Sequence, residues 1–547
     1  MPNYLSPGVY MEEVSSGPRP IEAVGTAVAA FVGYTVKAQE ERDGETHDLT
    51  GKPILVTNWS QYVAKFGEFH KDAYMPDSVY GYFQNGGGRA YIISVKTMAG
   101  SADPDLAEPA TVSVPSAGNS RTTLTFKAKE GGPIGNNLSV KVSAIQPPAL
   151  ESGKDDDSDD DSKSSKSSSS SKKDTPTPTH FKLEIEQGGE VVEAYDSLTL
   201  DEGAKENVVE VLQKQSKLVF VEVKGKTDVV PSDGTYELDG GEMKTKEVTV
   251  KDYQGDTAER TGLSGLEAID DVTMIAVPDL MMSYEKGEID LMGIKSIQSR
   301  IVDYCELVRY CYAILDAPPR LTPQQVKEWR NSLPFDTSRA AMYYPWIQIA
   351  DVTGEGGRTR SVPPSGHIAG MFARVDNERG VHKAPANEVL RGALDLDMHV
   401  TKGEHDMLNP INVNVIRTFP GRGIRVWGAR NLTSDPEWRY VNVRRLFNMI
   451  EESIERGTQW VVFEPNDANL WARITRDVTS FLKLVWRTGA LFGTTPEQAF
   501  YVKCDAETNP PEVRDAGQLV VEIGISPVKP AEFVIFRVKQ WAGPDAE

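Results

Sequence analysis

The 547-residue sequence is poor in cysteine and contains no long apolar run. Only Cys305, Cys311 and Cys504 occur, without CxxC spacing, which argues against a disulfide framework and against a zinc site and suits a reducing compartment. We therefore expect three buried thiols. No stretch of about 18 apolar residues occurs, and no basic segment followed by an apolar one stands at the start, so we expect neither a membrane span nor a secretion signal.

Positive charge is also in short supply. The chain carries 59 Lys and Arg against 80 Asp and Glu, a formal net charge of -21, which opposes binding to nucleic acid or to an anionic membrane. Hydrophobic residues make up 39% of the chain, enough for well-packed cores. At roughly 150 residues per domain, the length predicts about three or four domains.

Motifs of catalysis are missing as well. The phosphate-binding loop motif is absent, and the glycine-rich pieces NGGGR and FPGRG do not open helices after strands. TGLSG at 261–265 has Leu266 where a nucleophile elbow needs glycine, and His399 and His405 are six apart rather than four. We predict no catalytic, cofactor-binding or metal site, with a site assembled from distant residues as the alternative.

An internal boundary is clear at residues 154–180, KDDDSDDDSKSSKSSSSSKKDTPTPTH, which contain no large apolar side chain. Such a segment cannot offset the entropy of ordering, so we predict a solvated linker. Its clustered Asp residues suggest a calcium loop as an alternative, but the glycine and the terminal Glu of an EF-hand are absent.

Short stretches of period-2 alternation surround this linker, among them TLTFKAK, LSVKVSAI, HFKLEIE and LVFVEVKG. They predict an all-β module over residues 101–257. On both sides the pattern changes to strands alternating with helices, such as AVAAFVGYT, RAYIISV, VTMIAVPD and CYAILDAP. The module therefore reads as an insertion into an α/β domain, and the whole chain as a multidomain α/β and α+β protein.

Two helices of this α/β domain have strong local signals. The first has a shared apolar face, formed by Leu291, Ile294, Ile297, Ile301, Cys305 and Val308. The second begins at Thr322, Pro323 and Gln325, which supply an N-cap, a first-turn proline and the N3 partner of a capping box.

The last third predicts two amphipathic helices. In YVNVRRLFNMIEESIERG the apolar stripe comprises Val443, Leu446, Phe447, Ile450 and Ile454. In NLWARITRDVTSFLKLVWRTG it comprises Leu470, Ile474, Val478, Phe481, Leu482 and Val485. The second helix also carries four cations, Arg473, Arg476, Lys483 and Arg487. Two interpretations stay open: a solvated outer face, or a basic face that meets an acidic partner.

Both ends of the chain are strand-forming and bordered by proline. Val9, Tyr10 and Met11 favour an extended strand, but the prolines around them separate it from any neighbouring element, so it must find a sheet edge elsewhere. Near the other end Leu519, Val521 and Ile523 alternate with Val520 and Glu522, and 533–538 read as a further strand beyond Pro527 and Pro530.

These residues resemble the contractile tail sheath proteins of bacteriophages, pyocin-like particles and other contractile injection systems. The resemblance rests on SPGVYMEEV, on the block GARNLTSDPEWRYVNVRRLFNMIEESIERGTQWVVFEPNDANLW, on GALFGTTPEQAFYVKCD and on ISPVKPAEFVIF. It covers the first 35 residues and about residues 400–541. Over 101–257 only EGGPIGNNLSVKVS resembles the β-rich outer domain of such sheaths.

The resemblance implies a domain arrangement. Residues 1–22 would form an N-terminal arm, 23–100 with 258–380 a central α/β domain, 101–257 the inserted outer domain, and 381–547 a C-terminal α/β sheath domain ending in an arm. Arms of neighbouring subunits would exchange strands. The arm residues would be Val9, Tyr10, Met11, Val14, Leu519, Val521, Ile523, Ile525, Phe533 and Ile535.

The family further implies hexameric rings stacked around an inner tube, with baseplate and terminal cap proteins as partners and sheath paralogues as further ones. The helix with Arg473, Arg476, Lys483 and Arg487 would face the tube. Assembly would take place in the bacterial cytoplasm, without nucleic acid or membrane insertion. The alternatives are a non-contractile shell or baseplate subunit and an α/β enzyme with a β insert. The insert itself is either a solvated decoration or a binding domain.

Overall fold

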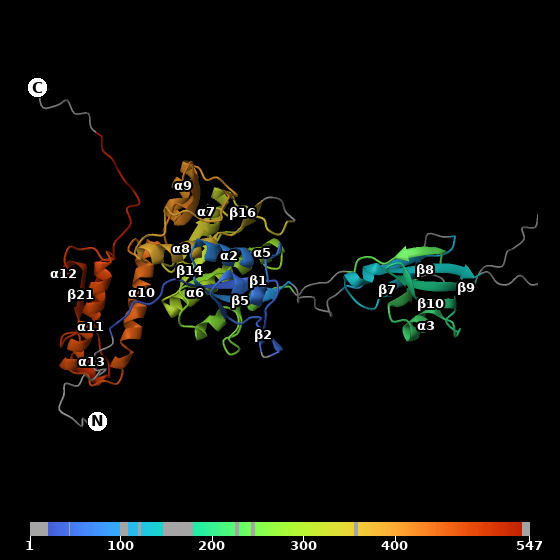
Figure 1. Ribbon diagram of the computed structural model, residues 1–547, viewed down its shortest axis with the longest axis horizontal. Helices are drawn as coiled ribbons and strands as arrows, with labels where there is room; N and C mark the ends of the chain where they lie inside the picture. Colours follow the sequence, from blue (N-terminus) through green and yellow to red (C-terminus); the bar gives the residue numbers. More distant parts are fainter. Residues whose placement is uncertain are drawn as a thin grey trace, which may run out of the picture. The chain divides into compact units, whose positions relative to one another are not determined.

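The computed structural model describes residues 20–42, 44–98, 108–118, 122–145, 179–224, 229–241, 247–354 and 359–538. The chain divides into two compact units, which are treated separately below (Figure 1). The body unit comprises Met1–Met98 and Val248–Glu547, and the insert unit comprises Ala99–Glu247. Across the described ranges, no helix combines the length and the apolar composition needed to cross a membrane.

An eight-stranded sheet forms the centre of the body unit. Its strands run parallel from β5 to β19, and the two outermost strands are antiparallel. In spatial order the strands are β20 (Gly423–Val426), β19 (Val413–Phe419), β15 (Ala340–Tyr344), β14 (Tyr312–Asp316), β13 (Met274–Ala276), β1 (Val28–Thr35), β5 (Arg89–Thr97) and β4 (Ile54–Val56). All eight residues of β1 are buried, as expected for a central strand covered on both faces.

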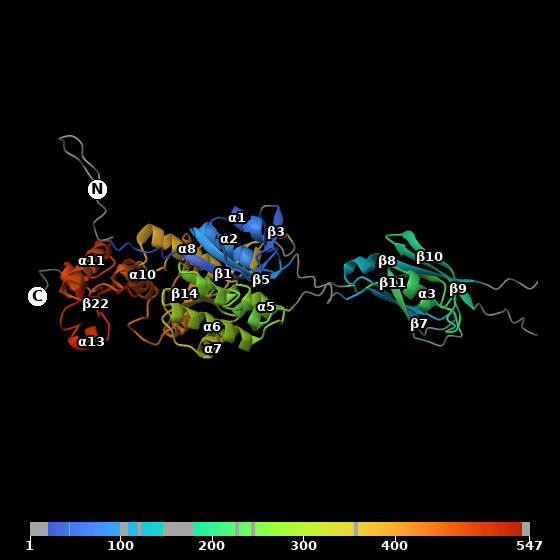
Figure 2. The same ribbon diagram turned by 90° about the horizontal axis from the view of Figure 1, so that it is seen from below.

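Helices cover both faces of this sheet. Figure 2 shows α1, α2 and α8 on one side of the strands and α6 and α7 on the other. The helices of this region are α1 (Trp59–Phe66), α2 (Met75–Asn85), α4 (Val250–Gln254), α5 (Leu280–Glu285), α6 (Leu291–Val308), α7 (Pro323–Asn331), α8 (Ser365–Arg379) and α9 (Lys402–Leu408). Helices α2 and α8 pack closely because a Cβ at Gly366 or Gly370 would lie 2.4 Å from a backbone oxygen of α2.

Smaller ribbons complete the region: β2 (Gln39–Arg42) with β3 (Glu45–Asp48), and β17 (Thr359–Val362) with β16 (Ile347–Ala350) and β18 (Asp395–Leu396). The capping box at Thr322 is confirmed, because its side chain and that of Gln325 each accept the other's backbone N–H. The apolar face expected on α6 is buried from Ile294 to Cys305, but Leu291 at its start is 43% exposed.

The insert unit contains two sheets. One has the strand order β10 (Glu190–Leu198), β9 (His180–Gln187), β8 (Leu138–Ile145), β12 (Gly234–Glu237), and the other β11 (Val219–Val223), β7 (Thr122–Ala128), β6 (Thr111–Pro115). Side chains such as Phe126, Phe181 and Leu183 form a core within the unit. The unit also contains helix α3 (Val208–Gln215), so the prediction of an all-β module is wrong at this element.

The C-terminal limit predicted for the insert is also wrong. Val248 and Tyr253 are buried in the core of the central sheet, and α4 begins at Val250, so 248–257 belong to the body unit. In the sequence KEVTVKDY, which had been included in the β module, tertiary packing selects a short capped helix. Of the linker predicted at 154–180, residues 154–178 lie outside the described residues.

The predicted start of the C-terminal domain, residue 381, is also wrong, because the core of the central sheet continues beyond it. Strand β19 pairs in parallel with β15, and Val413, Val415 and Val426 are buried in the central core. A separate core is built mainly from α10 (Val441–Gly457) and α11 (Ala468–Arg487), and Ile21 and Val381 also pack into it. The remaining elements are α12 (Pro496–Ala499), β21 (Phe500–Lys503), α13 (Pro511–Asp515) and β22 (Glu522–Ile525).

Helix α10 joins this C-terminal region to the central sheet. Arg445 donates to both carboxylate oxygens of Asp376 on α8, at 2.9 and 2.6 Å, and to the backbone oxygen of Thr26. Both charged side chains are 4% exposed. A buried ion pair with this many hydrogen bonds fixes geometry, because loss of one partner would leave an uncompensated charge.

Candidate assembly surfaces

In the described part of the chain, the C-terminal sheet consists of two strands, β21 and β22. They pair antiparallel, with Phe500 opposite Ile525 and Val502 opposite Ile523, and these side chains pack toward the core of α10 and α11. Within the described residues, neither outer edge of the pair has a further strand. Such a ribbon is marginal by itself and offers two rows of backbone groups for pairing.

The strand expected around Leu519 is shorter than its sequence pattern. Leu519 and Val521 lie half-buried against the C-terminal core, but β22 begins at Glu522. The reason is Asn509, whose side chain donates to the backbone oxygen of Val520 at 3.0 Å and accepts from its N–H at 2.7 Å. The amide thus replaces a neighbouring strand at this residue.

The strand expected at 533–538 does not form within the single chain. We call these six residues the tail segment. All five of its apolar side chains are exposed. The exposed fraction is lowest at Val534, 68%, and highest at Val538, 93%. Figure 1 shows the red tail running away from the rest of the body unit. A strand requires a partner for its backbone groups, and the described part of this chain offers none here.

The root of the tail segment is fixed by Glu532. Its carboxylate accepts from Arg430 at 2.9 and 2.7 Å, from Asn409 at 3.1 Å and from the hydroxyl of Tyr440 at 3.2 Å. Burial raises the pKa of Glu532, but the hydrogen bonds from Arg430 and Asn409 outweigh it and hold the pKa below its usual value. The chain is therefore free only beyond residue 532.

Sequence reasoning missed this anchor and the role of Asn509. Glu532 and Arg430 are 102 residues apart, and no local pattern relates them. At the other end of the chain, the predicted arm residues Val9, Tyr10, Met11 and Val14 lie outside the described residues. Just after them, Ile21 is buried in the C-terminal core and the N–H of Val24 donates to Ser453 on α10.

The four predicted cations of α11 share one exposed face. Arg473, Arg476, Lys483 and Arg487 are spaced three, seven and four apart, which places them on one side of the helix, opposite its buried residues. Arg473 stacks on the ring of Trp460 at 4.3 Å, and Arg476 pairs with Asp477 at 3.2 Å. We call this face the basic stripe. The six buried positions predicted for α11 are all confirmed.

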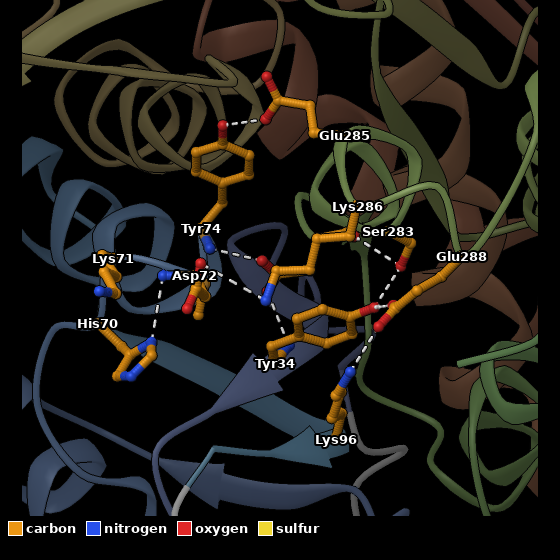
Figure 3. A network of polar contacts seen from close by, with 12 residues as sticks. Tyr34, His70, Lys71, Asp72, Tyr74, Lys96, Ser283, Glu285, Lys286 and Glu288 are labelled. Carbon is orange, nitrogen blue, oxygen red and sulfur yellow. Dashed lines mark hydrogen bonds and ion pairs between the residues drawn. The ribbon is translucent and has the colours of Figure 1, made fainter. Parts of the chain in front are cut away.

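A buried polar network in the central domain is the alternative kind of site, because carboxylates with shifted pKa values often mark catalytic centres. Figure 3 shows Tyr34 and Lys96 meeting Glu288, and the hydroxyl of Tyr34 and the ammonium of Lys96 each lie 2.5 Å from that carboxylate. Tyr74 similarly donates to Glu285. Every charged group of this set already has a partner within the protein.

Asp279 lies at the centre of the same region and is fully buried. Burial raises its pKa to about 7, although backbone N–H groups of Tyr74, Tyr34 and Met75 donate to it. Because the carboxylate joins the end of β1 to the start of α2, its role is structural. Among the described residues, no group of three or more His, Cys, Asp or Glu side chains is arranged to hold a metal ion. The three cysteines are buried free thiols, as expected.

Comparison with known sequences agrees with this picture of an assembly protein. The model of the phage tail sheath protein central domain matches residues 260–432, and that of the phage tail sheath C-terminal domain matches 433–540. Their common boundary follows β20, as the structural division does. Together the two models cover just over half of the chain.

Curated relatives carry the same description. A putative prophage major tail sheath protein of Pseudomonas aeruginosa (strain UCBPP-PA14) is 28% identical over 238 residues, which is 42% of this chain and 58% of the relative. The tail sheath protein of Escherichia phage P2 is 23% identical over 324 residues, 56% of this chain and 74% of the relative. The tail sheath protein of Enterobacteria phage T4 is 27% identical over 180 residues, which is 32% of this chain and 26% of the relative.

Solved structures show the same fold. The PVC sheath complex of an extracellular contractile injection system, in the contracted state, matches with a TM-score of 0.55 and 23% identity over 99% of both chains. The helical sheath of the anti-feeding prophage, also contracted, matches with a TM-score of 0.56 and 22% identity over 98% of this chain and 99% of the other. The fold is thus that of a contractile sheath. The chain belongs to the contractile tail sheath protein family.

Proposed function

We propose that this protein is the sheath subunit of a contractile injection apparatus. Copies polymerise as stacked hexameric rings around an inner tube and contract to drive the tube through a target envelope. The observation that carries the proposal is the pairing of an open two-stranded sheet with an exposed apolar tail segment in the same chain. The sheet has edges without a further strand, and the tail segment has strand-forming residues without a sheet.

Strand exchange between copies would join the two features. The tail segment with Phe533 and Ile535 would add to the C-terminal sheet of a second copy, and Val9, Tyr10, Met11 and Val14 would add to that of a third. Each backbone hydrogen bond contributes only about 1 kcal/mol, but several per arm, repeated over all neighbours, hold a polymer together. The tethers can persist while the globular domains rotate.

On this proposal, the burial of additional apolar surface between subunits drives contraction. The sequence has no phosphate-binding loop that would serve a nucleotide-driven cycle. A lattice of extended, poorly buried contacts would relax to one that buries more apolar surface, at roughly 25 cal/mol per Å². The step would be downhill and would take place once.

The inner tube is the proposed partner of the basic stripe. Its cations project from the exposed side of α11, so they are available to an acidic surface. Reversing charge with Arg473→Glu and Arg487→Glu should detach sheath from tube and leave tube-free polymers intact. Equal loss of both would overturn this assignment. Baseplate and cap proteins, and assembly in the bacterial cytoplasm, complete the proposal.

Electron microscopy of a truncated chain tests the function. Ending the chain after Glu532 keeps the anchor with Arg430 and removes the tail segment. We expect folded subunits that no longer form striated cylinders, whereas the full chain does. The matched control deletes fifteen residues inside 160–174, which should leave cylinders unchanged. A full chain that forms closed shells, or single particles only, would favour a shell subunit or an enzyme instead.

A further inference from the structure

The loop between α10 and α11 presents an apolar tip to solvent. Val462 is 62% exposed, the side chain of Phe463 is fully exposed, and Glu464 is exposed next to it. Phe463 also has a φ of 67°, a left-handed conformation that residues with a bulky side chain rarely adopt. We call residues 462–464 the tip. A strained backbone that holds an aromatic ring in water gives the single subunit no contact in return, which points to a role outside it.

Contacts on both sides hold the tip in place. Before it, the ring of Trp460 lies 4.3 Å from the guanidinium of Arg473. After it, the side chain of Asn466 donates to the backbone oxygen of Gln518 at 2.8 Å and accepts from Trp471 at 2.7 Å. A tip between fixed flanks loses little freedom on binding, so its shape is prepared for docking.

A pocket of about 950 Å³ lies at the opposite end of α10. We call it the α9 pocket. Its walls come from α9, from 379–387 after α8 and from 528–534, with Tyr440 at the start of α10. Its volume falls in the range of about 300–1,000 Å³ that encloses small ligands, and this is enough for a few side chains. The larger apolar groups of its lining include Pro410, Trp427 and Pro530.

This pocket is cationic, although the chain has a net charge of -21. Its two carboxylates, Asp406 and Glu532, are already paired with Lys402 and Arg430. Burial and the charge of Arg417 lower the pKa of His405 in the same lining. An anionic occupant fits this charge. The cations of the lining without a carboxylate partner among the described residues are Arg379, Arg417 and Lys529.

The tip and the α9 pocket are complementary but separate. The tip offers an aromatic ring followed by a carboxylate, and the pocket offers apolar walls and unpaired cations. The 17 residues of α10 lie between them and span about 25 Å, so a subunit cannot fill its own pocket with its own tip. A contact between two different surfaces is head-to-tail, and repeated contacts of this kind generate rings or helices.

We propose that the tip of one copy docks in the α9 pocket of a second copy, with Phe463 among the apolar side chains and Glu464 against Arg417. Arg417 is the half-buried one of the three unpaired cations, so its ion pair is the best shielded from water. This inference rests on the sheath assembly proposed above and adds a contact between globular surfaces to the exchange of arms. A buried ring and an ion pair fix the angle between neighbours, which an extended arm does not.

Disulfide trapping between two copies tests the proposal. One full-length chain carries Phe463→Cys and the other carries Ala386→Cys or Ala531→Cys, which line the pocket, and the two are mixed before assembly. The natural cysteines are buried, and each single variant alone gives the background. Because a disulfide requires Cα atoms within about 7 Å, mild oxidation should give a covalent dimer only where the tip occupies the pocket.

The matched control carries Phe492→Cys, at an aromatic position that is 71% exposed and lies outside the tip. We expect a dimer with Cys at 463 and none with Cys at 492. If polymers form and Cys at 463 gives no dimer, or no more than Cys at 492, this inference is overturned while the proposed function stands. If the unmodified chain forms no polymers, both fail.

Charge reversal gives a second readout. Glu464→Arg and Arg417→Glu should each lower the yield of cylinders, because each places two like charges together. The chain with both changes should recover the yield, since the ion pair is restored with its signs exchanged. Single variants that assemble as the unmodified chain does, or a double variant without recovery, would overturn the pairing of Glu464 with Arg417.

Discussion

The two sheets of the body unit contrast in completeness. In the central sheet, β1 has a parallel neighbour on each side and all of its residues are buried. In the C-terminal sheet, β21 and β22 have only each other among the residues that the structure describes, and most of their residues are half-buried or exposed. The first sheet is finished within one chain, whereas the second has edges that a neighbouring copy can complete. On the function proposed above, the first sheet provides stability and the second provides assembly.

The largest expected effect lies in the complete sheet. Phe31 is fully buried in β1 and meets the ring of Tyr82 edge-on at 5.5 Å. Phe31→Ala should lower the free energy of unfolding of the subunit by about 3–5 kcal/mol, through lost burial and a cavity. Urea unfolding measures it. Phe533→Ala, at a 72% exposed position, is the control and should change the free energy by less than about 0.5 kcal/mol. Similar losses in both would contradict the contrast.

A pH-dependent effect follows from Asp316, at the end of β14. Burial raises its pKa from 3.8 to about 7, against hydrogen bonds from Ser365. Between about pH 4 and pH 7 the folded chain therefore keeps a proton that the unfolded chain releases, and folding stability falls as the pH rises. Asp316→Asn keeps an acceptor for the N–H of Ser365 but does not titrate.

The wild type should therefore lose stability relative to Asp316→Asn by about 1.4 kcal/mol per pH unit across this window. Thermal unfolding of both chains from pH 4 to pH 9 measures the difference. Above about pH 7.5 it should become constant, because the carboxyl is then ionised in both states. A difference that does not change between pH 4 and pH 7 would show that Asp316 is charged in the folded protein.

A smaller effect is expected at the anchor of the tail. Glu532→Ala leaves Arg430 without its carboxylate, which should cost about 1.5–3 kcal/mol locally. Hydrogen exchange over 526–532 should accelerate by about ten-fold or more, with β1 unchanged. The control is Glu507→Gln, which removes the ion pair between Glu507 and Lys503. The side chain of Glu507 is 80% exposed, so this change should have little effect. Unchanged exchange in Glu532→Ala would mean that other contacts hold the root.

The smallest effect on stability, and a large one on assembly, is expected at Phe536. It is 86% exposed, so Phe536→Ser should leave the unfolding free energy of the subunit within about 0.5 kcal/mol. The yield of cylinders should nevertheless fall if the tail segment adds to the C-terminal sheet of a neighbour, as proposed above. Val192→Ser, at a 54% exposed apolar position of the insert unit, is the control. Equal cylinder yields in the two variants would remove Phe536 from the assembly contact.

Local patterns predicted four helices well, α6, α7, α10 and α11. The periodicity of α11 identified its six buried residues and its basic stripe, and Thr322, Pro323 and Gln325 identified the start of α7. Elements whose pattern is short were less predictable. The segment before Gly255 was included in the predicted all-β module, but Val248 and Tyr253 are buried in the central core and the segment folds as α4.

The assembly surfaces were predictable only in part. The apolar tail segment and the proline-bordered ends stood out in the sequence, because strand-forming residues without a neighbouring strand are visible as a pattern. The ion pair that anchors Glu532 and the hydrogen bonds of the Asn509 side chain to Val520 were not predictable, since each depends on residues that only folding brings together. The groove between α10, the end of α6 and β22 combines three separate segments of the chain and had no local signal either.

The sequence by itself determined the long amphipathic helices and their apolar faces, and it predicts that both ends need a partner strand, since these properties follow from residue spacing over a few turns. Only the tertiary structure decided where the central sheet ends, which sheet remains open and what lies beside its edges. The physical reason is that packing and hydrogen bonding join residues distant in the sequence, and their energy exceeds the small local preferences of a short segment.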